Sequence, residues 1–370
     1  MRTGRWLLAM TFLGSFATIL VERAVYFYAK ERLGFSRTVN LALALAFGAA
    51  YVVGALSSHR LARLLGERRL LAAVIGCQVA TYGALAFTAG AVALFVGGTL
   101  VGLWCGAFWP VVESYVGAGR TPRQALPAVG RFNLAWASAV PLALAAAGPI
   151  VDRLPTALFS GGAALWAACL AMAAPLPPRP AHLAADHPER LTAPQAARVG
   201  RLLVASRWLL LASYSCLWIL AALLPDVLGE LGYSARSGAG LSGLLDAVRL
   251  GAFAWLGLWP GWHGRVGPLL AAIAALPAGF FLALLGPSLA AVLAGEVVFG
   301  LAAGLVYYSA LYYAIVAKDA SVGAGGGHEG LIGAGFALGP ATGLLAVALT
   351  PVLGGRQAGM LVGVGPLLAA

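Results

Sequence analysis

Long apolar stretches recur along the whole 370-residue chain and exclude a water-soluble fold. Apolar residues make up 61% of the sequence and charged residues only 10%. A soluble domain carries about 25% charged residues. One helical crossing of a bilayer needs roughly 20 apolar residues. The chain is therefore predicted to be an all-α, polytopic membrane protein whose main partner is the lipid bilayer.

Charges, prolines and glycine pairs divide the sequence into stretches of helix length. Six of them precede a polar, proline-rich interval, at 6–28, 39–57, 70–89, 91–112, 125–148 and 155–174. Five follow it, at 208–225, 239–259, 266–285, 289–316 and 329–351. A last run, 358–370, is long enough for only part of a crossing. We predict about 12 transmembrane helices, of which the last is short or uncertain.

The polar interval between the two sets of helices is too rich in proline and charge to cross a bilayer. It divides the chain into an N-terminal six-helix bundle (1–175), a cytoplasmic linker (176–207) and a C-terminal bundle (208–370) of six helices, or of five and a partial one. An offset near 200 residues brings glycines and prolines of the two halves into register, which indicates two six-helix pseudo-repeats.

The net charge of +11 is interpreted here as a topology signal rather than as a nucleic-acid surface. If both termini are cytoplasmic, inside segments carry 16 of the 24 Lys and Arg residues. We therefore expect an integral protein of the plasma or inner cell membrane with both termini in the cytoplasm. No nucleic-acid partner is expected.

One loop and one helix carry recognisable motifs. In GLWPGWHGRVGPL (257–269), Gly257, Gly264 and Arg265 have the spacing of the pattern GxLaDrxGrkxxL, although Gly261 stands at its Asp position. The helical motif GLIGAGFALGPATG (330–343) resembles GxxxGPxxGG. Its matching residues are Gly335, Gly339, Pro340 and Gly343.

These motifs and the six-plus-six arrangement resemble the major facilitator superfamily. The resemblance implies a cavity between two halves and secondary active transport of a small solute by alternating access, with or without a coupling ion such as a proton. The motif residues are expected to serve gating and helix packing, because a glycine-bounded loop turns tightly and a GxxxG step lets helices approach. The second motif normally lies in the fifth helix of the family, whereas here it lies in the eleventh.

Five charged residues interrupt the predicted membrane segments. A charge at the centre of a span costs about 2.5–3.5 kcal/mol on insertion scales, so each should face a partner or a watery cavity. The five are Glu22, Arg23, Asp246, Arg249 and Glu296. We predict that they belong to a solute or ion pathway. Buried ion pairs that only fix helix packing are the alternative.

Aromatic residues gather on the helices that the resemblance assigns to the cavity. The pathway candidates are Trp109, Tyr214, Trp218, Tyr307 and Tyr308. Their polar ring atoms suit a polar or amphipathic solute. Anchoring at the membrane interface is the competing interpretation.

Enzymatic and metal-dependent functions find no support in the sequence pattern. The run HEGLI (328–332) lacks the second histidine of HExxH, so no metal site, cofactor or catalytic residue is predicted. Glu329 is interpreted as a favourable charge at the start of a helix. The alternatives to a transporter are a non-transporting receptor or assembly scaffold and, less favoured, an integral membrane enzyme.

Overall fold

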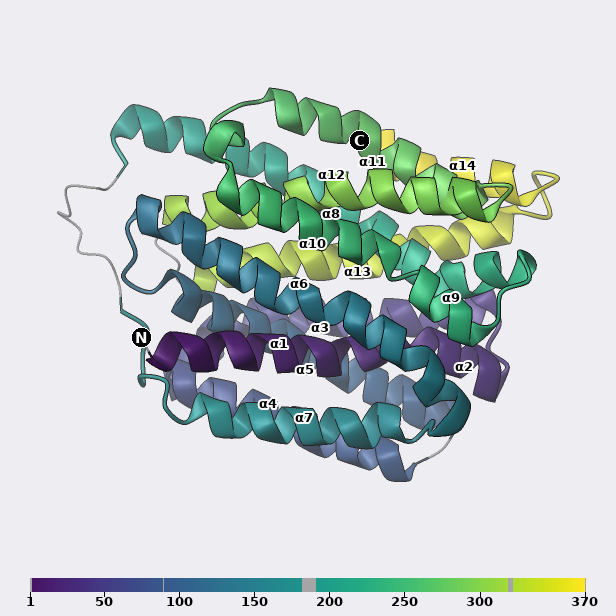
Figure 1. The fold of residues 1–370 in the computed structure, drawn as a ribbon, viewed down its shortest axis with the longest axis horizontal. Coiled ribbons are helices and arrows are strands. Elements are labelled where there is room, and N and C mark those ends of the chain that lie inside the picture. The colour runs from purple at the N-terminus through teal and green to yellow at the C-terminus, as the bar shows by residue number, and fades with distance from the viewer. Residues whose placement is uncertain (1, 89, 182–190, 319–321, 370) are drawn as a thin grey trace.

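Helices form all the regular secondary structure of the described residues. The computed structural model describes residues 2–88, 90–181, 191–318 and 322–369, and its long helices run side by side along one axis (Figure 1). The N-terminal half contains α1 (Arg2–Glu22), α2 (Val25–Leu33), α3 (Arg37–Leu65), α4 (Glu67–Phe87), α5 (Ala91–Gly117), α6 (Pro122–Arg153) and α7 (Ala157–Ala173). The C-terminal half contains α8 (Ala193–Glu230), α9 (Ala235–Leu241), α10 (Leu244–Leu258), the short 3-10 helix η1 (Pro260–Trp262), α11 (Gly267–Leu285), α12 (Leu289–Lys318), α13 (Val322–Leu349) and α14 (Arg356–Ala369).

The predicted all-α membrane fold is confirmed. Ten helical segments are long and apolar enough to cross a bilayer, with α1–α2 and α9–α10 each counted as one. The 17-residue α7 is a shorter apolar helix. The 14-residue α14 extends about 21 Å at 1.5 Å per residue, which is less than a full hydrocarbon core. These twelve units match the predicted order, including the short last helix.

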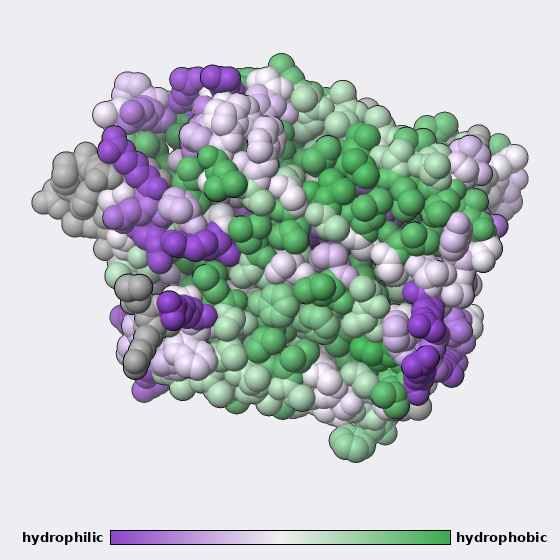
Figure 2. Space-filling model, in the orientation of Figure 1, coloured by the Kyte–Doolittle hydropathy of each residue, from purple (hydrophilic) through white to green (hydrophobic). Residues whose placement is uncertain are grey.

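The surface agrees with a membrane environment. In the view of Figure 2, hydrophobic residues cover the middle of the bundle and hydrophilic residues gather toward its two ends. We call the end where α7 ends and α8 begins the linker end, and the opposite end the far end. The linker end is on the left in Figures 1 and 2.

Helix packing repeats between the two halves. Helix α1 packs against α6 as α8 packs against α13, α3 against α5 as α10 against α12, and α4 against α5 as α11 against α12. The halves meet where α3 packs on α13 and α6 packs on α10. This pattern is that of two six-helix pseudo-repeats.

Glycine lets helices pack closely both between the halves and within the C-terminal half. A Cβ atom on Gly48 of α3 would lie 2.3 Å from the backbone carbon of Phe336 in α13. A Cβ on Gly339 of α13 would lie 2.1 Å from the carbonyl oxygen of Ser215 in α8. Any larger residue would force these helices apart, because both neighbours are backbone atoms.

Two membrane segments are interrupted. Between α1 and α2, the backbone N–H groups of Arg23 and Ala24 both donate to the carbonyl of Ile19, at 3.0 Å each, so the regular helical ladder stops there. Between α9 and α10, the chain turns at Ser242 and Gly243. Each break leaves a short helix, α2 or α9, at the far end.

Several helices extend beyond their predicted limits, and three of these extensions bear on the site. Helix α13 begins at Val322 instead of 329, so the prediction that Glu329 starts this helix was wrong. Its first turns contain VGAGGG, and glycine does not end a helix that is packed within a bundle. Helix α5 runs through Glu113 to Gly117. Helix α8 begins at Ala193, behind a capping box formed by Thr192 and Gln195, inside the range 176–207 assigned to the linker.

Candidate functional site

A cavity of about 60 Å³ lies at the centre of the bundle, between the two halves. A buried water needs at least roughly 10–15 Å³ of such space, so the cavity has room for a few waters. Its N-terminal wall is formed by Ser15, Thr18, Ile19, Glu22, Arg23, Tyr51, Trp109, Trp136 and Val140. Its C-terminal wall is formed by Tyr214, Leu217, Arg249, Tyr307, Glu329, Ile332 and Phe336.

Six of the ten predicted pathway residues line this cavity. They are Glu22, Arg23, Trp109, Tyr214, Arg249 and Tyr307. The indole of Trp218 lies outside the lining, where it stacks against Phe336 with ring centroids 4.0 Å apart. The hydroxyl of Tyr308 lies toward the linker end and donates to the carbonyl of Leu126 on α6 (3.3 Å), which joins the two halves.

Asp246 joins the two arginines of the cavity wall. Its carboxylate accepts a hydrogen bond from Arg23 Nη1 at 3.0 Å and makes an ion-pair contact with Arg249 Nη2 at 2.8 Å. All three side chains are at least 96% buried. Arg249 also lies over the ring of Trp136, with the guanidinium carbon 4.9 Å from the centroid. One carboxylate thus pairs with two guanidiniums, and the Arg23 contact crosses from one half to the other.

Glu296 lies behind the cavity and faces a helix terminus. Its fully buried carboxylate accepts a hydrogen bond from the backbone N–H of Leu245 at 3.3 Å. Leu245 is in the first turn of α10, where unpaired N–H groups favour an anion. The described partner of Glu296 is therefore a backbone group of another helix and not a basic side chain.

A second polar cluster was not predicted from the sequence. Glu113, His328 and Glu329 each offer one ligand atom, and these atoms lie within 4.8 Å of one another. The hydroxyl of Tyr51 donates to the Glu329 carboxylate. Glu113 was missed because a charge was taken to end the apolar stretch at 112. The sequence feature that could have identified Glu113 was its position one helical turn after Pro110, in the stretch GLWCGAFWPVVESY.

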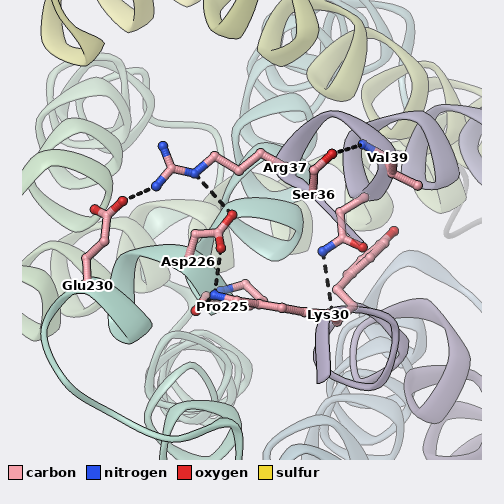
Figure 3. A network of polar contacts seen from close by, with 9 residues as sticks. Lys30, Ser36, Arg37, Val39, Pro225, Asp226 and Glu230 are labelled. Atoms are coloured by element: carbon pink, nitrogen blue, oxygen red, sulfur yellow. Dashed lines mark hydrogen bonds and ion pairs between the residues drawn. The ribbon is translucent and has the colours of Figure 1, made fainter. Parts of the chain in front are cut away.

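Ion pairs close the far end of the cavity (Figure 3). Asp226 near the end of α8 contacts Lys30 of α2 at 2.6 Å and Arg37 of α3 at 3.1 Å. Arg37 also pairs with Glu230 of α8. The start of α3 is fixed by Ser36, whose hydroxyl accepts the N–H of Val39 at 3.4 Å. The C-terminal carboxylates thus bind the N-terminal cations across the interface.

At the linker end, α6 and α10 approach each other closely, and the loop after α10 is held by hydrogen bonds. Gly257 of α10 faces Gly130 of α6, and a Cβ on Gly257 would lie 3.7 Å from the Cα of Gly130. In the following loop, Gly264 adopts a positive φ of 67°. Its carbonyl accepts from Arg198 at 2.7 Å and its N–H donates to the Tyr313 hydroxyl at 3.0 Å. Arg265, the predicted gating residue, is exposed.

The glycine motif of α13 lies on crowded contacts. A Cβ on Gly335 would lie 2.7 Å from the Cβ of Tyr214, and one on Gly343 would lie 3.0 Å from Leu41. Pro340 is buried within the same helix. The motif therefore faces α8 on one side and α3 on the other.

Comparison with known proteins identifies the family to which the sequence is similar and two structures with a similar fold. The family profile of the Major Facilitator Superfamily matches residues 6–344. The fold is similar to that of a mutant form of the nucleoside transporter NupG, with a TM-score of 0.70 at 14% identity over 99% of this chain and 97% of the other. It is also similar to the human organic anion transporter MFSD10 (TETRAN), with a TM-score of 0.68 at 17% identity over 99% and 98% of the two chains. No curated protein sequence matches this chain.

Proposed function

The chain belongs to the Major Facilitator Superfamily, and from this premise we propose that it is a secondary active transporter which moves a small solute by alternating access. The observation that carries the proposal is the central cavity, whose wall is divided between the two halves. A cavity shared in this way can open to either side when one half rocks against the other. We further propose that the linker end faces the cytoplasm.

The cavity size supports an occluded arrangement. Pockets for drug-sized ligands measure about 300–1,000 Å³, whereas this cavity measures about 60 Å³. Contacts between the halves close it at both ends, through Asp226 at the far end and Tyr308 at the linker end. Solute entry therefore requires one of these sets of contacts to separate.

The lining favours a polar solute with an apolar face. Trp109, Trp136 and Phe336 provide aromatic surface, while Arg249 and Glu22 provide opposite charges. Because the wall contains both aromatic faces and charged groups, a solute that is only apolar or only charged would leave part of the wall unmatched. The two similar structures suggest the probes: a nucleoside and an organic anion.

Flux into proteoliposomes tests the solute. We expect saturable uptake of radiolabelled uridine or of carboxyfluorescein that is lost in Arg249→Gln. If both probes enter only by leakage that does not depend on the protein, this choice of solute class is wrong. That result would not address the transport mechanism. A second experiment therefore addresses alternating access without any solute.

Labelling of Ile332→Cys in the cavity wall tests access from each side. A membrane-impermeant maleimide should modify this cysteine from both sides of the membrane. A cross-link between Lys30→Cys and Asp226→Cys should abolish labelling from the far end and spare labelling from the linker end. The parent, with Cys77, Cys105, Cys169 and Cys216, sets the background. A permanently closed receptor would show no labelling from either side.

A further inference from the structure

We propose that Glu113, His328 and Glu329 form a binding site for one divalent first-row transition-metal ion, shared by the two halves and adjoining the solute cavity, with which it shares Glu329. Glu113 comes from α5 in the N-terminal half, and His328 and Glu329 come from α13 in the C-terminal half. Metal binding can be measured without transport, so this inference and the proposed function can fail independently.

The three side chains converge in the interior of the protein. Their ligand atoms lie within 4.8 Å of one another, and their exposed fractions are 3% for Glu113, 0% for His328 and 3% for Glu329. Tetrahedral zinc has ligands at about 2.0–2.2 Å from the metal for imidazole nitrogen and carboxylate oxygen. Small rotations of these side chains would bring the three atoms to such distances.

Most donor atoms of the cluster have no partner. Among the described residues, neither carboxylate oxygen of Glu113 and neither ring nitrogen of His328 forms a hydrogen bond. Buried polar atoms in native proteins are nearly always paired, and exceptions point to a ligand or ion. Four such atoms at one place therefore indicate an occupant.

The charge of the cluster indicates a cation. Two carboxylates face one another in a buried environment, where like charges repel strongly. A cation next to this part of α13 is Arg207 of α8, whose Nη2 atom lies 3.6 Å from where a Cβ on Gly327 would be. In the described structure Arg207 forms no ion pair with either carboxylate, and its Nε and Nη2 atoms lack hydrogen-bond partners. A divalent cation would neutralise both carboxylates directly.

The donor types select the class of metal. Two carboxylates and one imidazole suit Mn²⁺, Fe²⁺, Co²⁺, Ni²⁺ or Zn²⁺, because imidazole is a preferred ligand of these ions. Calcium and magnesium take all-oxygen ligand sets. A space of about 10 Å³ lined by Glu113 and His328 provides room for one further ligand such as water.

The surrounding residues hold the ligands in place. Gly325, His328 and Glu329 are spaced i, i+3 and i+4 on α13 and therefore share one helix face. A Cβ on Gly325 would lie 2.8 Å from Oε2 of Glu113, so glycine makes room for that carboxylate. The Tyr51 hydroxyl orients Glu329 by donating to it, which is a common outer contact of metal-binding carboxylates.

The site would link metal binding to conformation. Glu329 belongs both to this cluster and to the wall of the central cavity. A metal bound by α5 and α13 together holds the two halves in contact near the linker end. Bound metal should therefore stabilise the arrangement in which that end is closed.

Cobalt titration is the direct test. Protein stripped with a chelator and held in detergent should bind one Co²⁺ per chain and develop visible d–d absorption bands, which Zn²⁺ should remove. Glu113→Gln and His328→Gln should each weaken Co²⁺ binding by more than about 100-fold, since loss of an outer contact alone costs 10–100-fold. The carboxylate-retaining Glu113→Asp should bind Co²⁺ more tightly than Glu113→Gln.

Matched controls separate this site from incidental binding. Glu296→Gln removes a buried carboxylate outside the cluster, and His263→Gln removes a histidine of the linker-end loop. Both should keep the bands of the parent. Absence of d–d bands in the parent at millimolar Co²⁺ would overturn the proposal whether or not the variants fold, and the cluster would then hold a proton. Bands that persist in the Glu113→Gln/His328→Gln double variant would also overturn it.

Discussion

Replacing Asp246 with asparagine should strongly destabilise the protein, because it leaves two buried guanidiniums without their shared anion. Arg23 and Arg249 contact Asp246 at 3.0 and 2.8 Å. Arg23 belongs to the N-terminal half and Asp246 to the C-terminal half, so the substitution removes both an interhelical and an intrahelical attraction.

The magnitude follows from these separations and from burial. With charge centres about 4 Å apart and an effective dielectric constant of about 20, each attraction amounts to roughly 4 kcal/mol, or roughly 8 for both. The substitution also removes the cost of burying the Asp246 carboxylate, which offsets several kcal/mol. Breaking a buried pair typically costs about 3–5 kcal/mol, and we expect a loss of unfolding free energy in this range.

Unfolding in mixed micelles with increasing SDS provides the assay. Asp152→Asn is the matched control, because Asp152 is exposed and its substitution should change stability by less than about 0.5 kcal/mol. The double variant Arg23→Gln/Asp246→Asn should recover part of the loss, since one stranded charge is then absent. A loss below about 1 kcal/mol for Asp246→Asn would refute the view that this ion cluster holds the halves together.

Three further predictions concern packing, gating and topology. Gly339→Ala should separate α13 from α8 and lower thermal stability, because its Cβ would lie 2.1 Å from a carbonyl oxygen. The control Gly76→Ala, which has open space around it, should raise stability by about 0.5–1 kcal/mol. Equal melting temperatures of the two variants would contradict this prediction. Asp226→Asn removes two ion pairs of about 0.2–1 kcal/mol each and should increase far-end labelling of Ile332→Cys roughly 2- to 30-fold. Glu31→Gln, an exposed carboxylate without an ion pair among the described residues, should not increase it. A reporter inserted between residues 178 and 198 should be accessible only from the cytoplasm, and a signal from outside the cell would invert the topology.

Hydropathy predicted the fold because the membrane restricts the possibilities. Apolar stretches of about 20 residues have few alternatives to membrane helices. The order of the twelve units and the short last helix followed from this constraint alone. Helix limits were less predictable, since a charge or a glycine ends an apolar stretch in the sequence without ending the helix. Glu113 lies inside α5 for this reason, and His328 lies inside α13.

The contacts of the candidate site required the three-dimensional structure. The cost of a charge inside the membrane predicted that Arg23 and Asp246 each need a partner or a cavity, but the two residues are 223 positions apart in the chain. No periodicity within one helix can identify such a partner. The linker-end loop gives a second example, because the motif emphasised Arg265 while Arg198 of α8 makes the hydrogen bond to the loop backbone.

The interruptions after α1 and α9 have a mechanical consequence. At Arg23–Ala24 and at Ser242–Gly243 the helical ladder is already broken, so bending there costs few additional hydrogen bonds. The short helices α2 and α9, which contact each other, are thus two segments at the far end of the cavity that can tilt about these breaks. The linker end has no comparable break in α3, α5 or α13, whose helices continue without interruption. For a transporter of the proposed kind, we therefore expect the two ends to differ in stiffness: the far end should open by local bending at these breaks, whereas the linker end should open by movement of whole helices.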